Sequence, residues 1–447
     1  MSEYIVAIEL GSSKIVGIAG YRDESGNLVV TAIEKKETSE NIIKRGCIQN
    51  VDKVFACINR VKMLLENRLA PAKITKVYVG VSGVSVTAEK LVTRRSFHED
   101  SIIRQAHIQK LKDECNSMLP STVDTLEIVP TGYIIDGRAE RNATGVTGTT
   151  IEAHYKAITA KPVLRRNIDR CIIEHLKLPI AGYITGALAT ADVVLSKEER
   201  MLGCMLVDFG AETTTVSIYK NDALVHLVTL PMGGHNITRD ISSLNIISSE
   251  AEQLKISSGM AMGFKSENNR RLKFEGDDMV ELDLAKLTTV VEARSEEILS
   301  NVEKQLKNSG LERKDLTAGI VVVGAAAKLN GLIDLIQERF VEVKVRMGAL
   351  RKDIQTVEKE RSQVNDYIQA VGLLYAGSEE CTKTPAHVQV EVEQPVAIEP
   401  EEEEIIITPE EKEETPKRKR KGGIFSALFD KFGKLIEEGE DDDDDDK

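Results

Sequence analysis

Tryptophan is absent from this chain, and aromatic residues of all kinds make up only 4% of its 447 residues. The hydrophobic fraction is nevertheless 41%, which is ordinary for a soluble protein with a substantial core. The core is therefore expected to be aliphatic, built from the many runs of Ile, Val and Leu. A chain of this length is expected to fold into more than one domain.

The cysteine spacings that mark disulfide frameworks or metal sites are also missing. No two of the six cysteines are spaced as Cys-x-x-Cys, and none has a histidine beside it at ligand spacing. We expect free thiols in a reducing compartment. No apolar run reaches the ~18 residues of a membrane-spanning helix. Because the sequence starts directly with a strand pattern, we expect no secretory signal.

Positive charge is in deficit, since the formal net charge is −13. This balance argues against nucleic acid as the main partner, because phosphate backbones are bound by basic surfaces. The charge is also uneven: residues 401–404 and 441–446 are acidic blocks, whereas 417–421 is a basic block. Such blocks are typical of disordered tails. The closing Asp run with Lys447 is either native or an added tag.

A tight turn between two apolar runs lies near the start of the chain. Residues 5–8 and 15–18 predict two buried strands, joined through Leu-Gly-Ser-Ser. Gly11 permits a backbone conformation that larger residues resist, and small serines leave the backbone N–H groups accessible. Converging N–H groups form a concavity that suits phosphate. Taken alone, a turn of this kind is more often only a turn.

The same design recurs at residues 205–218. Both copies run from an apolar strand through an acidic residue, an apolar residue, a glycine and small polar residues into a second apolar strand. A third strand is expected after each copy, at 28–33 and at 224–230. An internal repeat constrains the fold. Two similar halves, each with a phosphate turn, predict a nucleotide held between them.

Three further segments are suited to a nucleotide. Residues 321–327 predict a strand followed by a small-residue loop that allows close approach of a ring or ribose. Gly233 and Gly234 precede a helix and offer a second contact. Glu252 and Lys255 lie one turn apart on one helix face. They are either contacts for adenine or ribose, or an ordinary pair of surface charges.

The C-terminal stretch carries a separate signal. Residues 378–421 lack any period and predict a disordered linker. Residues 422–437 then place their apolar side chains on one face of a helix; these are Ile424, Phe425, Leu428, Phe429, Phe432, Leu435 and Ile436. With the basic 417–421 block before it, this helix fits an anionic membrane surface. A groove on a partner and docking on the chain's own body are the alternatives.

Together these segments resemble the actin/Hsp70/sugar-kinase superfamily, and within it the bacterial division family FtsA. The resemblance rests on the turn at 9–14, on the segments 207–210, 233–241, 251–255 and 365–373, on an insertion after a strand at 74–81, and on the C-terminal helix. It covers about residues 4–377 and 422–437. Each motif is loose by itself, and their order is specific.

The resemblance implies an α/β fold: an actin-like two-domain body with duplicated β-sheet cores and an interdomain nucleotide cleft. The expected parts are a first core domain (1–83 with 161–197), a small inserted domain (84–160), a second core domain (198–233 with 313–377), an outer subdomain (234–312), the linker (378–421), the membrane-targeting helix (422–437) and an acidic tail (438–447).

The expected cofactors are ATP and Mg²⁺. The phosphate contacts are expected from Gly11, Ser12, Ser13 and Lys14 on one side and from Gly210, Ala211, Glu212 and Thr213 on the other. Glu9 and Asp208 are expected to hold Mg²⁺ through water, since hard oxygen ligands suit this ion. The nucleoside is expected among Gly233, Gly234, Glu252, Lys255, Gly324 and Ala325.

The resemblance further implies self-association into filaments and docking of the C-terminal tail of the tubulin-like protein FtsZ on the outer subdomain. The terminal helix would anchor the FtsZ ring to the cytoplasmic face of the inner membrane at the septum, where other division proteins gather. Arg294 is the expected contact for the acidic FtsZ tail, with a solvated arginine as the alternative.

Three departures from the superfamily pattern bear on activity. Glu9 replaces the usual Asp, and Ala325 replaces a second Gly. Thr185, Gly186 and Ala187 offer no amide or carboxylate that could orient an attacking water. Orientation of this water is a large part of catalysis in phosphoryl transfer. We therefore expect ATP binding with slow or absent hydrolysis. A sugar or acetate kinase and a chaperone-like ATPase of the same fold are the alternatives.

Overall fold

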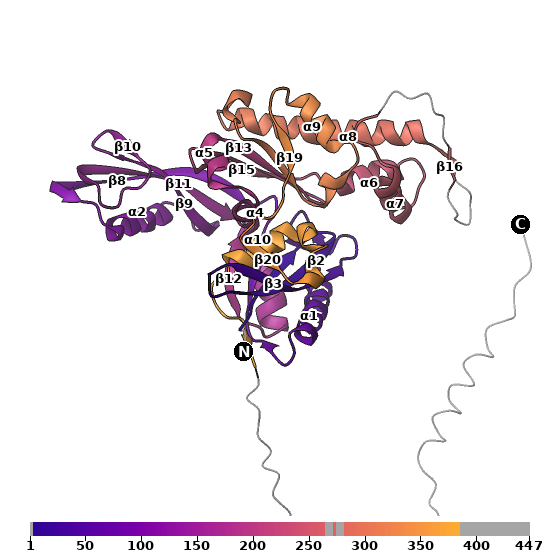
Figure 1. Cartoon of the computed structure of the whole chain (residues 1–447), viewed down its shortest axis with the longest axis horizontal. Helices are drawn as coiled ribbons and strands as arrows, with labels where there is room; N and C mark the ends of the chain where they lie inside the picture. The colour runs from indigo at the N-terminus through magenta and orange to yellow at the C-terminus, as the bar shows by residue number, and fades with distance from the viewer. Residues whose placement is uncertain (1–2, 264–270, 274–280, 385–447) are drawn as a thin grey trace, which may run out of the picture. The chain divides into compact units, whose positions relative to one another are not determined.

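The computed structural model describes residues 3–263, 271–273 and 281–384 (Figure 1). The predicted terminal helix 422–437 with its membrane-facing residues, the acidic tail 438–447 and most of the predicted linker lie outside the described residues. The fold has the predicted mixed α/β architecture, built on two large sheets.

The first sheet contains both strands of the first predicted hairpin. Its strands are β1 (Ile5–Leu10), β2 (Lys14–Arg22), β3 (Leu28–Glu37), β7 (Val77–Val81), β12 (Ile180–Thr185) and β20 (Ile354–Thr356), in the order β12-β7-β1-β2-β3-β20. β1 pairs antiparallel with β2 and parallel with β7. Helix α1 (Val51–Arg68) packs on β2 and β3, where Gly17 leaves room for the Val61 side chain.

The second sheet repeats this arrangement. Its relevant strands are β13 (Cys204–Phe209), β14 (Thr214–Lys220), β15 (Ala223–Leu230), β18 (Gly319–Val323) and β19 (Val345–Met347), in the order β15-β14-β13-β18-β19. β13 pairs antiparallel with β14 and parallel with β18, as β1 does with β2 and β7. The predicted duplication of the sheet core is therefore confirmed in strand order and direction.

The helices of the second half lie in two groups. Helices α8 (Leu284–Asn308) and α9 (Leu332–Arg339) bury apolar side chains against the second sheet. Helices α6 (Gly234–Ser242) and α7 (Ser248–Ser258) form a smaller cluster with the start of α8, in the predicted outer subdomain. Strands β16 (Arg271–Lys273) and β17 (Glu281–Asp283) form a separate pair before α8.

The predicted insertion has its own apolar cluster. It contains β8 (Thr87–Ile102), α2 (Gln105–Ser117), β9 (Asp124–Ile135), β10 (Arg138–Glu140) and β11 (Thr147–Ala160). Residues 137–150, which are rich in Gly, Thr and Arg, include β10 and the start of β11. β8 also reaches the second sheet, because Thr87 pairs with Val228 of β15.

The C-terminal part of the body returns to the first domain, contrary to the predicted boundary. Helix α10 (Ile368–Ala376) packs on α4 (Gly186–Val194) and on β1, β2 and β7. Gly372 allows this contact, since a Cβ there would lie 2.3 Å from the Ala189 carbonyl oxygen. β20 likewise pairs with β3. The predicted range 313–377 of the second domain therefore ends earlier, after β19.

The predicted linker also begins too early. Strand β21 (Thr382–Lys383) pairs with β6 (Lys73–Ile74), and the Cys381 and Thr382 side chains are buried. Strands of two residues lie below what sequence periodicity can indicate. The remaining short elements are β4 (Ile43–Lys44), β5 (Cys47–Ile48), α3 (Pro162–Asp169), η1 (Arg170–His175), α5 (Lys197–Leu202), η2 (Arg313–Asp315), η3 (Ala325–Lys328), η4 (Glu358–Glu360) and η5 (Val364–Tyr367).

Candidate functional site

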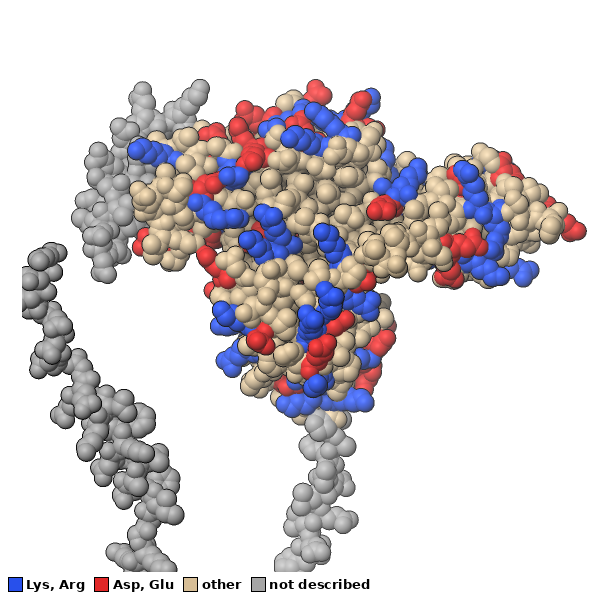
Figure 2. Space-filling model, turned by 180° about the vertical axis from the view of Figure 1, so that it is seen from behind, with Lys and Arg blue, Asp and Glu red and all other residues tan. Residues whose placement is uncertain are grey.

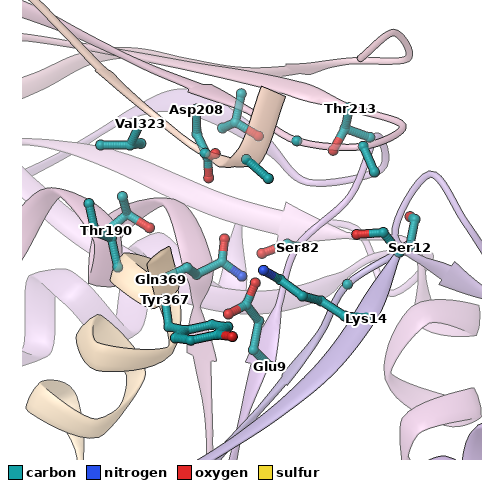
Figure 3. Close-up of a pocket in the computed structure, with 18 of the residues that line it drawn as sticks. Glu9, Ser12, Lys14, Ser82, Thr190, Asp208, Thr213, Val323, Tyr367 and Gln369 are labelled. Atoms are coloured by element: carbon teal, nitrogen blue, oxygen red, sulfur yellow. The ribbon is translucent and has the colours of Figure 1, made fainter. Parts of the chain in front are cut away.

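A cavity of about 200 Å³ lies between the two repeated hairpins (Figure 3). Residues from the first half that line it include Glu9, Gly11, Ser12, Ser13 and Lys14. Residues from the second half include Asp208, Gly210, Ala211, Glu212, Thr213, Gly324 and Ala325. Most of the residues predicted to contact phosphate, metal and nucleoside are thus brought to one cavity.

The two turns have the same backbone geometry. Gly11 N–H donates to the Lys14 carbonyl at 3.0 Å, and Gly210 N–H donates to the Thr213 carbonyl at 2.8 Å. A Cβ atom would lie 2.7 Å from the Lys14 oxygen in the first turn and 2.9 Å from the Thr213 oxygen in the second. Both glycines are therefore required by the close approach of their own turn, and not only by flexibility.

Glu9 and Asp208 occupy matching places in the two hairpins, two residues before each glycine, and both face the cavity (Figure 3). Burial raises the pKa of Asp208 to about 6. Burial and the nearby Asp208 charge raise the pKa of Glu9 to about 7, against the opposing effects of the Lys14 charge and a hydrogen bond from the Ala370 backbone. Two carboxylates in one recess suit a divalent cation.

The number and type of side chains that could coordinate a cation determine how it would be held. Within residues whose side chains are described, no group of three or more His, Cys, Asp or Glu side chains is arranged to hold a metal ion. Mg²⁺ keeps several waters and is usually bound by one or two carboxylates together with substrate phosphates. Glu9 and Asp208 fit this second mode.

Lys14 is the cation of the first turn. Its ammonium group lies over the Tyr367 ring, 4.6 Å from the centroid. Burial lowers its pKa, although the Glu9 charge opposes this effect. An ammonium held near the Glu9 carboxylate and over an aromatic face is positioned to meet an anionic ligand.

The other predicted nucleoside contacts do not line this cavity. Gly233 and Gly234 lie behind the second turn, where Gly234 N–H donates to the Gly210 carbonyl at 3.0 Å. Lys255 Nζ binds the Gly234 carbonyl at 3.2 Å and Glu252 Oε2 at 2.6 Å, so these two side chains tie α7 to the start of α6. Their role at a nucleoside stays a prediction.

Glu212 makes a contact that its sequence position did not indicate. Its side chain is only 9% exposed, and Oε2 accepts a hydrogen bond of 2.6 Å from the Arg45 backbone N–H. Arg45 and Gly46 form the turn between β4 and β5 and both have positive φ. The carboxylate is thus directed to the first domain, and it joins the second phosphate turn to the β4–β5 hairpin.

Several lining residues were missed by the sequence analysis. Ser82, Thr190, Lys328, Asp366 and Gln369 all reach the cavity. Lys328 of η3 pairs with Asp366 of η5 across its rim. Single polar residues at the ends of buried strands and helices carry no local signal, whereas 365–373 had already contributed to the resemblance.

Arg294, the predicted partner contact, already has acidic neighbours. Its guanidinium binds both carboxylate oxygens of Asp240, at 2.5 and 3.0 Å, and also contacts Glu297. These bonds raise its pKa. An acidic tail would have to share or displace them.

The raised carboxyl pKa values predict a pH-dependent stability. Unfolded carboxyls titrate near pH 4, so between about pH 4 and 7 the folded chain binds more protons than the unfolded chain. Stability without divalent cations should therefore fall as pH rises through this window. Thermal melting in chelator should show this fall for the wild type and a smaller one for Glu9→Gln. Parallel curves for the two proteins would contradict the assignment.

The Glu212 contact predicts a local effect on the β4–β5 hairpin. Glu212→Ala removes a charged acceptor, and such hydrogen bonds contribute about 1.5–3 kcal/mol. Hydrogen exchange of the Arg45 amide should accelerate about tenfold or more. The matched control is Glu338→Ala on the exposed side of α9. Unchanged exchange at Arg45 in Glu212→Ala would show that the bond does not hold the hairpin.

The sequence and fold of this chain were compared with those of known proteins. A family model for the cell division protein FtsA matches residues 205–372, and one for the type IV pilus assembly protein PilM matches residues 7–269. A chain of the PilM-PilN type IV pilus biogenesis complex superposes with a TM-score of 0.61 at 14% identity, over 84% of this chain and 98% of that chain. This likeness shows the fold alone.

Curated relatives give the closer relationship. The cell division protein FtsA of Porphyromonas gingivalis is 33% identical over 390 residues, which span 86% of this chain and 80% of that protein. The cell division protein FtsA of Escherichia coli (strain K12) is 27% identical over 401 residues, 87% of this chain and 93% of that protein. With this identity across most of both chains, the protein belongs to the FtsA family of cell division proteins.

Proposed function

We propose that this chain is an ATP-binding, actin-like adaptor that anchors the FtsZ ring to the cytoplasmic membrane during division. The observation that carries the nucleotide part is the pair of equivalent glycine turns facing one cavity, each preceded by a recessed carboxylate. Membership in the FtsA family supports the division part.

In this proposal ATP lies with its phosphates between the Gly11–Lys14 and Gly210–Thr213 turns. Backbone N–H groups of the turns and the Lys14 ammonium would neutralise phosphate charge. Mg²⁺ would be held through water by Glu9 and Asp208, and it would offset the repulsion between these carboxylates and the phosphates. Gly324 and Ala325 line the cavity beyond β18 and leave space for the nucleoside.

The membrane part of the proposal rests on the sequence of the last helix. No helix within residues 3–263, 271–273 and 281–384 is long and apolar enough to cross a membrane. Figure 2 shows Lys and Arg intermixed with Asp and Glu on one face of the body, so that this face has mixed charge. The 417–421 block and the apolar face of 422–437 are the segments suited to an anionic bilayer.

Filament formation, docking of the FtsZ tail on the outer subdomain and recruitment of other division proteins complete the proposal. The Arg294 pairing with Asp240 joins α8 to α6 within that subdomain. An acidic FtsZ tail that competes for Arg294 would loosen this joint, so binding there should depend strongly on ionic strength.

The nucleotide site is tested by Asp208→Asn, which keeps the size of the side chain and removes its charge. Affinity for ATP with Mg²⁺ should fall about tenfold or more, whereas affinity measured in chelator should change little or increase. Calorimetry in both conditions checks this expectation. The control is Asp334→Asn at the exposed start of α9. Equal Mg²⁺ dependence in Asp208→Asn and the wild type would contradict the metal assignment.

The anchor is tested by co-sedimentation with vesicles containing anionic lipid. Phe429→Asp places a charge in the apolar face of the terminal helix and should release the protein from vesicles, with FtsZ released as well. Ser426→Asp adds the same charge on the opposite face and should bind nearly as the wild type. A truncation should end at residue 384, because β21 belongs to the body. Pelleting of the truncated chain would contradict the anchor.

A further inference from the structure

The Gln369 side-chain amide lies in the candidate cleft without a hydrogen-bond partner in the described part of the chain. It is the second residue of α10, and its side chain reaches the cavity between Glu9, Lys14 and Ser82 (Figure 3). Its carboxamide makes no hydrogen bond to any residue in the described part of the chain. A polar group that can donate and accept is thus left available inside the cavity.

Ser82 provides a second such group. Its hydroxyl is buried and has no hydrogen-bond partner among the described residues, although it lines the same cavity. Buried hydroxyls are nearly always satisfied by protein or by ordered water. The Ser82 hydroxyl is therefore a second polar group of this cavity that has no hydrogen-bond partner among the described residues.

Gly186 explains how these two groups come together. A Cβ atom at this position would lie 2.1 Å from Ser82 Oγ, 3.0 Å from Gln369 Cδ and 3.1 Å from Gln369 Nε2. The side chains of Ser82 and Gln369 thus occupy the space that any residue other than glycine would fill at the start of α4. An amide side chain from α10 thus lies beside Gly186 at the start of α4.

We propose that Gln369 and Ser82 hold the water that attacks the terminal phosphate of ATP, so that this chain is a slow ATPase. The inference rests on the proposed nucleotide function. The Gln369 carbonyl would accept one O–H of the water and the Ser82 hydroxyl would fix its oxygen. Orientation of the nucleophile is a main source of catalysis in phosphoryl transfer.

The reaction balances as simple hydrolysis. The water oxygen forms a bond to the γ-phosphorus as the bond from that phosphorus to the β–γ bridging oxygen breaks. The electron pair of the broken bond stays on the bridging oxygen of ADP. One proton of the water remains on the released phosphate, and the other passes to solvent. No oxidant, reductant or further reactant is needed.

The test measures binding and chemistry separately on the full chain. Calorimetry gives the affinity for ATP with Mg²⁺, and single-turnover assays with protein in excess give the rate constant of phosphate formation. Gln369→Ala should lower this rate constant about tenfold or more, with affinity changed less than about threefold. Ser82→Ala should lower it severalfold, again with little effect on affinity. Gln355→Ala on β20, an exposed glutamine of the same domain, is the matched control and should behave as the wild type.

Gly186→Ala supplies an independent variant that keeps both functional groups. Its added methyl should displace the Ser82 hydroxyl and Gln369, and so reproduce the loss of rate. If it does not fold, the variants at Gln369 and Ser82 still decide the question.

The outcomes separate the two proposals. A wild type that binds ATP but forms no phosphate, or a Gln369→Ala variant that hydrolyses at the wild-type rate, overturns the water-positioning role and leaves nucleotide binding intact. An equal loss of rate and affinity in Gln369→Ala also overturns it, because the residue would then serve binding alone. A wild type that does not bind ATP overturns the proposed function and this inference together.

Discussion

The meeting of two carboxylates in one recess is the constraint on which the rest of this structure depends. Glu9 and Asp208 come from strands at equivalent places of a duplicated core, so the repeat itself brings like charges to the same cavity. Burial raises the pKa of both groups. The cleft is therefore under electrostatic stress near neutral pH unless it holds protons or a cation. A cation-assisted anion site follows directly from this arrangement.

The backbone around the two carboxylates is also arranged to receive a charged ligand. The glycines of both turns are fixed by the close approach of a carbonyl oxygen, and this fixes where the turn N–H groups lie. The Lys14 ammonium acts directly on Glu9. Negative groups suited to a metal ion and positive groups suited to phosphate thus lie side by side, and each would be costly to bury without a ligand.

The fold was predictable from the sequence where a local pattern is repeated, and less so where distant segments meet. The two hairpins and their third strands follow from apolar periodicity and turn residues, whereas the two-domain fold was implied by the resemblance. The place of α10 could not be predicted, because an almost wholly apolar helix shows no face that selects one sheet over another. The Glu212–Arg45 bond joins residues 167 positions apart, and neither residue type indicates such a partner.

The same distinction applies to the site. Residues adjacent to a glycine turn could be assigned, whereas Ser82 and Gln369 come from a strand end and a helix start with no motif of their own. Glu252 and Lys255 were correctly placed on one helix face, but their contact with α6 depends on tertiary packing. Sequence patterns thus identify the elements that carry a site more readily than the side chains that other elements contribute.

The contacts that cross the cleft set the energy scale on which a ligand would act. Arg45 binds Glu212, Ser248 Oγ binds Glu40 at 2.7 Å, and Lys328 pairs with Asp366. The last two are exposed, and bonds of that kind contribute about 0–1 kcal/mol each. The Glu212 bond is the least exposed of the three. Together these three bonds contribute a few kcal/mol, which is within the differential affinity that a bound ligand can supply. A nucleotide that touches both turns would favour the closed arrangement by contacting both halves at once. The buried carboxylates would oppose closure when no cation is present. Occupancy of this cleft and the relative position of the two halves are thus expected to be coupled, whether or not hydrolysis is fast.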